Sequence, residues 1–88
     1  MISTSTLTRA GELDSGRDYV IAGYDRDRRL LTIDTGDGHA RLMLSNLQKY
    51  ALLKHAALHC ADYEENLIGH ILKVVHNGRY VEMKFFKP

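Results

Sequence analysis

The fold is decided by residues 29–44, which read RLLTIDTGDGHARLML. Two apolar stretches, Arg29–Asp34 and His39–Leu44, flank Thr35–Gly38, where two glycines allow the positive φ angles of a tight turn. This pattern predicts a β-hairpin with one apolar face. If Asp37-Gly38 forms the turn, the opposed pairs are Ile33 with Leu42, Leu31 with Leu44, and Asp34 with Arg41.

The stretch before this hairpin predicts a third strand beside it. Tyr19–Tyr24 is rich in β-branched and aromatic residues, and Asp25–Arg28 is a polar turn. A turn centred on Arg26-Asp27 places Val20 opposite Ile33 and Ala22 opposite Leu31. Both hairpins then bury the same face of the middle strand, which indicates a three-stranded meander.

A helix is predicted over Asn46–Cys60. Ser45 with Gln48 three residues later is the signature of a capping box at a helix N-terminus. At 100° per residue, Gln48, His55 and His59 fall on the polar side. The predicted apolar face consists of Leu47, Tyr50, Ala51, Leu53, Ala57, Leu58, Cys60 and Ala61.

A last hairpin follows the polar loop Asp62–Asn66. Asn77-Gly78 is a strong two-residue turn signal, and it joins Leu67–His76 to Arg79–Phe86. The expected inner pairs are Val74 with Val81, Leu72 with Met83, and His70 with Phe85.

The resulting order, β-β-β-α-β-β, is that of the OB-fold, a five-stranded partly open barrel with its helix before the last two strands. We therefore expect a mainly β protein with one helix, either an OB-like barrel or an antiparallel meander packed on the helix. Residues 1–16 are expected to form a flexible N-terminal arm with one short edge strand near Ser5–Arg9. Residues 17–88 are expected to form a single small domain.

Composition excludes several classes of protein. The chain has 88 residues, a formal charge of +1 and 44% apolar residues, so it is neither a charge-driven coat for duplex DNA nor a disordered chain. Its single cysteine, Cys60, cannot close an internal disulfide. We see no secretory signal and no membrane span, so we expect a cytoplasmic protein without membrane contact.

No residue pattern supplies a nucleophile, a base and an orienting group together, so an enzyme and a cofactor are not expected. His55 and His59 lie four apart on the helix, the spacing of two metal ligands, but a site needs a third ligand, and we predict no metal. His70 is expected in the core, and Cys60 as an inert buried thiol.

The first functional hypothesis is a non-enzymatic module that binds single-stranded nucleic acid. OB-folds bind such strands on their second and third strands, by stacking bases on aromatic rings and by placing cations on the phosphates. The predicted contact residues are Tyr19, Tyr24, Arg26, Arg28, Arg29 and Arg41.

The alternative is a protein–protein interaction module, an accessory or inhibitory factor or a homodimer, that acts by occupying a partner surface. Apolar residues on the predicted outer face would form the interface, and arginine and tyrosine are common at interfaces too. The predicted interface residues are Ile21, Leu30, Met43, Ile71 and Phe86.

Overall fold

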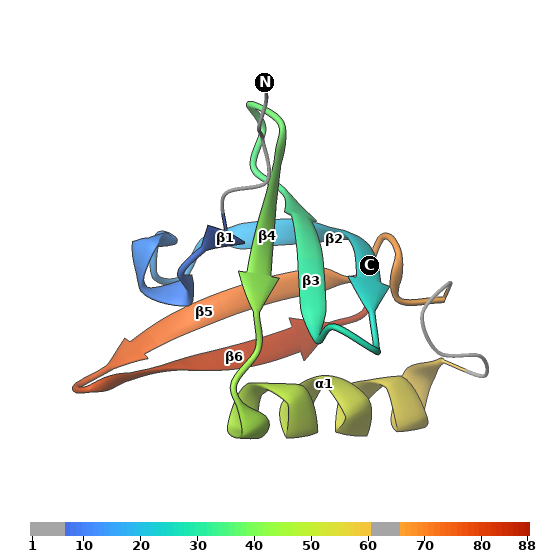
Figure 1. The fold of residues 1–88 in the computed structure, drawn as a ribbon. Coiled ribbons are helices and arrows are strands. Elements are labelled where there is room, and N and C mark those ends of the chain that lie inside the picture. The colour runs from blue at the N-terminus through green and yellow to red at the C-terminus, as the bar shows by residue number, and fades with distance from the viewer. Residues whose placement is uncertain (1–6, 61–65) are drawn as a thin grey trace.

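The structure, a computed structural model, describes residues 7–60 and 66–88. Over these residues one sheet curls beside one long helix (Figure 1). The helical elements are the 3₁₀ turn η1 (Ala10–Glu12) and the helix α1 (Asn46–His59). The strands are β1 (Leu7–Thr8), β2 (Asp18–Asp25), β3 (Leu30–Asp34), β4 (His39–Met43), β5 (Ile71–Asn77) and β6 (Tyr80–Phe86).

The six strands form a half-barrel in the order β1-β4-β3-β2-β5-β6. The long strand β2 joins the two parts of this sheet, because it pairs antiparallel with β3 on one side and with β5 on the other. Within the described ranges no strand ladder connects β6 back to β1 or β4, so the barrel stays open there. The prediction of a mainly β, OB-like fold with one helix is confirmed.

A bulge in β2 overturns the predicted register of the first hairpin. Ile21 pairs with Ile33, and after a shift between Ile21 and Gly23, Tyr24 pairs with Leu31. The prediction that Val20 faces Ile33 was wrong by one residue, which exchanges the two faces of the strand before the bulge, and the prediction that Ala22 faces Leu31 was wrong by two residues. A bulge inserts an extra residue whose effect on register cannot be seen in the apolar pattern alone.

The other two hairpins are shifted by two residues from their predicted registers. Leu31 pairs with Leu42 in place of Leu44, and Val74 pairs with Met83 in place of Val81. A shift of two keeps every side chain on its predicted face, because side chains alternate with period two. The first shift arises because the loop between β3 and β4 spans four residues, and the second because the turn lies at Gly78-Arg79.

The helix begins as predicted but buries a different face. Ser45 Oγ accepts the backbone N–H of Gln48, and the Gln48 side chain accepts the Ser45 N–H, so the capping box is confirmed. Its buried residues are Leu52, His55 and Ala56, whereas Leu47, Tyr50 and Leu58 are exposed. Apolar residues occur nearly all round this helix, so periodicity could not identify the face that packs on the sheet.

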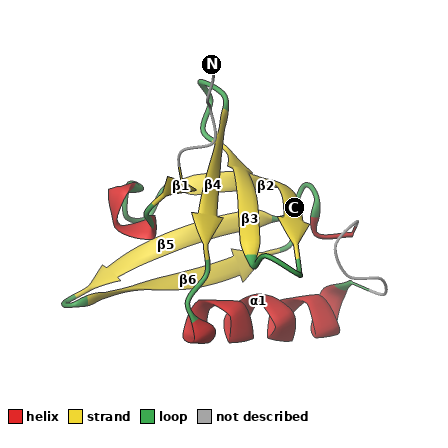
Figure 2. Ribbon diagram, in the orientation of Figure 1, coloured by secondary structure: helices red, strands yellow, loops and turns green. Residues whose placement is uncertain are grey.

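Helix α1 runs beside β6 and covers the edge of the sheet (Figure 2). The Gln48 side chain donates from Nε2 to the Val81 carbonyl at 2.9 Å, and the His55 ring lies 6.0 Å from the ring of Phe85. An uncovered strand edge invites pairing with other chains, and a covering helix prevents this.

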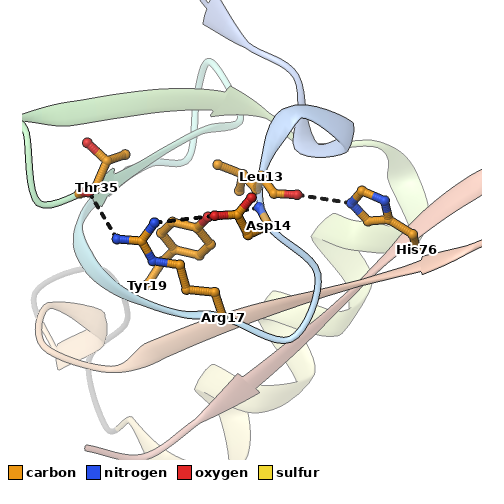
Figure 3. Close-up of polar contacts among 6 residues, drawn as sticks. All are labelled: Leu13, Asp14, Arg17, Tyr19, Thr35 and His76. Atoms are coloured by element: carbon orange, nitrogen blue, oxygen red, sulfur yellow. Dashed lines mark hydrogen bonds and ion pairs between the residues drawn. The ribbon is translucent and has the colours of Figure 1, made fainter.

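Residues 7–16, which belong to the predicted N-terminal arm, lie against the body of the fold in the structure. The predicted edge strand is present as β1, which pairs parallel with β4 through Leu7 and Thr8. Leu13 is buried in the core, and its carbonyl accepts from His76 Nε2 at 3.0 Å (Figure 3). Residues 1–6 and most of the predicted loop Asp62–Asn66 lie outside the described residues.

The buried face of α1 can be tested with two matched leucine substitutions. Leu52→Ala removes a fully buried side chain and should lower the free energy of unfolding by about 2–5 kcal/mol. Leu58→Ala removes an exposed side chain from the same helix and should change it by no more than about 0.5 kcal/mol. Urea unfolding measures both, and a larger loss for Leu58→Ala would contradict the observed packing.

Candidate interaction groove

Both tyrosines predicted to stack on bases lie in the hydrophobic core. Tyr19 is 4% exposed and Tyr24 is 8% exposed, so neither ring offers a free face. The hydroxyl of Tyr19 accepts the backbone N–H of Asp14 at 2.9 Å, and the guanidinium of Arg17 covers the ring at 5.2 Å (Figure 3). The prediction of an exposed tyrosine platform was wrong, because the β2 register brings both rings inward.

Three of the four predicted arginines lie in the turn between β2 and β3, and the fourth lies on β4. Arg26 and Arg28 are exposed in the turn between β2 and β3, and Arg28 lies 3.9 Å from the carboxylate of Asp25. Arg29, in the left-handed region at φ 56°, donates to the Asn46 side chain at 2.9 Å and so ties this turn to the start of α1. Arg41 lies on β4, half-buried beside β1.

The predicted protein-interface residues are divided between the core and the surface. Ile21 and Leu30 are buried, which corrects their predicted exposure. Met43 and Phe86 are exposed and Ile71 is half-buried, as an outer face requires. These five residues therefore do not make a continuous interface.

Instead of facing solvent, His55 is buried and forms a polar chain with His70 and Cys60. His55 Nε2 lies 2.9 Å from His70 Nδ1, and His70 Nε2 lies 3.9 Å from the Cys60 sulfur. The thiol donates to the Asn66 carbonyl at 3.5 Å, so the sulfur accepts from His70 Nε2–H. His70 Nδ1 is then left to accept from His55 Nε2–H, and each proton of the chain has a partner.

In this hydrogen-bonded network the two imidazoles and the thiol are all neutral. Burial, reinforced by the nearby His59, lowers the pKa of both His55 and His70 below its ordinary value. Burial also raises the pKa of the Cys60 thiol, whereas a nucleophilic cysteine needs a lowered pKa. Within residues 7–60 and 66–88, no group of three or more histidine, cysteine or acidic side chains is arranged to hold a metal ion. The hydrogen-bonded group of His55, His70 and Cys60 is thus suited to stabilising the core.

Acid should destabilise the fold through His55 and His70. Because their folded pKa values lie below 6.5, the unfolded chain binds more protons, and stability falls as pH drops below about 6.5. A second proton on His70 Nδ1 would also place two N–H groups face to face across the 2.9 Å contact. Urea unfolding between pH 8 and pH 5 should show this loss.

Two histidine variants test whether the buried pair causes the loss of stability at low pH. His70→Gln should flatten the dependence of stability on pH, whereas His39→Gln, which changes an exposed histidine, should leave it as in the parent protein. An unchanged slope in His70→Gln would contradict the role given to the buried pair.

The open side of the half-barrel holds a groove that the sequence patterns did not reveal. Two adjoining hollows, of about 700 and 460 Å³, share the lining residues Ser45, Gln48, Tyr80 and Val81. We call them together the mouth groove. Leu7–Ala10, Met43, Leu44 and Arg79 complete the first hollow, and Leu47, Ala51, Glu82 and Met83 complete the second.

Four large side chains from separate parts of the chain gather around the mouth groove. They are Leu7, Met43, Leu47 and Tyr80, and they are 43, 58, 77 and 61% exposed. Exposed apolar side chains are ordinary when scattered, but a group of them around a concavity is typical of a binding site. Met43 was among the predicted interface residues, but only folding brings it together with the other three, so no local pattern could have identified the group.

No family model, no curated protein and no solved structure matches this chain. In the described part of the chain, no helix has the length and apolar character that crossing a membrane requires.

Proposed function

We propose that this protein is a non-enzymatic interaction module that holds a segment of a partner protein in the mouth groove. The observation that carries this proposal is the convergence of Leu7, Met43, Leu47 and Tyr80 around one concave surface. Covering this apolar surface would remove it from water, which favours association by about 25 cal/mol per Å² before the costs of binding.

The shape of the groove favours a short segment as the occupant. Hollows of about 700 and 460 Å³ are of the size that accommodates small ligands or a few side chains. Tyr80, exposed in the middle of the groove, offers the rigid aromatic surface that dominates many protein interfaces. Ser45, Gln48 and Val81 line the same surface, where the Gln48 side chain accepts the Ser45 N–H and donates to the Val81 carbonyl.

Single-stranded nucleic acid is less well supported as the ligand. Of the residues first expected to bind it, Tyr19 and Tyr24 are buried, and Arg29 is held by Asn46. The exposed Arg26 and Arg28 lie in the turn between β2 and β3 and do not line the mouth groove. Binding of an oligonucleotide in place of a peptide is therefore kept as an alternative outcome of the binding experiment.

Selection of peptides from a displayed random library tests the proposal. The protein should enrich peptides with apolar residues, and Tyr80→Ser should weaken their binding about tenfold or more, since it removes the central aromatic contact. The control, Val20→Ser, changes an exposed apolar residue outside the groove and should leave their affinity unchanged. Fluorescence anisotropy with the selected peptides gives the affinities.

Three results would contradict the proposal. The first is the absence of enriched peptides, and the second is equal binding by Tyr80→Ser and the parent protein. The third is a preference for labelled DNA or RNA oligonucleotides that depends on Arg26 and Arg28. Light scattering after size exclusion adds a further check, because self-association that Tyr80→Ser abolishes would make a second copy the occupant of the groove.

A further inference from the structure

Two arginines from opposite ends of the chain line the same part of the mouth groove. Arg9 follows β1 and Arg79 lies in the turn before β6, and both line the larger hollow beside Tyr80. Local sequence could not show this arrangement, because it depends on η1 crossing toward the start of β6. The result is an apolar groove with a cationic part.

Neither guanidinium has a carboxylate within ion-pair distance among the described residues. Two other surface cations in the same ranges do have such a partner: Arg17 lies 3.4 Å from Asp14, and Lys73 lies 3.3 Å from Asp18. Glu12, the acid nearest to Arg9 in the sequence, directs its carboxylate to the backbone N–H of Arg9. Arg9 and Arg79 are therefore available to an incoming anion.

The start of α1 adds to the positive potential of this surface. Ser45, Leu47 and Gln48 form one wall of the groove, and the first turn of this 14-residue helix contains no acidic residue. Helix N-termini carry partial positive charge, part of which the capping box already compensates here. Glu82 places a negative charge in the groove, and it lines only the smaller hollow.

We infer, on the basis of the proposed function, that the partner segment is acidic as well as apolar. Its apolar side chains lie against Leu7, Met43, Leu47 and Tyr80, and a carboxylate flanking them faces Arg9 and Arg79. Glu82 excludes a second carboxylate from the far end of the groove, so the segment is acidic on one side only. This arrangement fixes the direction in which the segment lies.

Synthetic peptides with one apolar core and different flanks test this selectivity. The core of leucine and phenylalanine carries glutamates at its N-terminal end, at its C-terminal end, or at neither end, where glutamine replaces them. One of the two glutamate peptides should bind roughly three- to tenfold more tightly than the glutamine peptide at low salt, and added salt should reduce the difference.

Charge variants assign the effect to the two arginines. Combined Arg9→Gln and Arg79→Gln should bring the preferred glutamate peptide to the affinity of the glutamine peptide. Lys84→Gln removes a cation on β6 that does not line the groove, so the preference should remain. Circular dichroism of each variant verifies that it is folded.

The outcomes separate this inference from the proposed function. If the glutamate and glutamine peptides bind equally and Tyr80→Ser abolishes both, the groove binds a partner but the acidic selectivity is overturned. If no peptide binds, the proposed function fails as well. If an oligonucleotide displaces the peptides and binds more tightly through Arg9 and Arg79, the acidic peptide is the wrong ligand.

Discussion

The bulge between Ile21 and Gly23 is the constraint on which the rest of the structure depends. It lies in β2, the strand that pairs with both β3 and β5 and so joins the two parts of the sheet. Bulges bend a strand and increase its twist, which suits a sheet that curls into a half-barrel. The local shift in register also allows Tyr19, Ile21 and Tyr24 to enter the core from the same strand.

The open barrel and its helix together explain where the mouth groove lies. Helix α1 covers the edge of β6. Over the described residues, no strand pairing joins β6 to β1 or β4, so this side of the barrel is open. The groove forms at this opening, and its apolar side chains come from β1, β4, α1 and β6. Core packing and the proposed binding therefore use different faces of α1: Leu52 and Ala56 face the core, and Leu47 lines the groove.

The buried histidines illustrate how a core accommodates polar groups. His55 and His70 satisfy one another at 2.9 Å, and Cys60 continues the chain to the carbonyl of Asn66. Such a chain is favourable while each donor has an acceptor, because an unpaired polar group in the interior costs about 1–3 kcal/mol. The same three residue types could suggest metal binding or catalysis in the sequence, yet their arrangement maintains neutral, hydrogen-bonded groups.

The sequence by itself determined the order of the elements, the start of α1 and the inner faces of β3 to β6. These follow from local causes: glycine in turns, the Ser45–Gln48 capping box and the alternation of apolar residues. Tertiary structure alone decided the bulge in β2, the buried face of α1 and the groove lined by Leu7, Met43, Leu47 and Tyr80. A helix that is apolar nearly all round can pack through several faces, and only the fit against β6 and the core selects one. Likewise, residues distant in sequence form a site only after the sheet has curled.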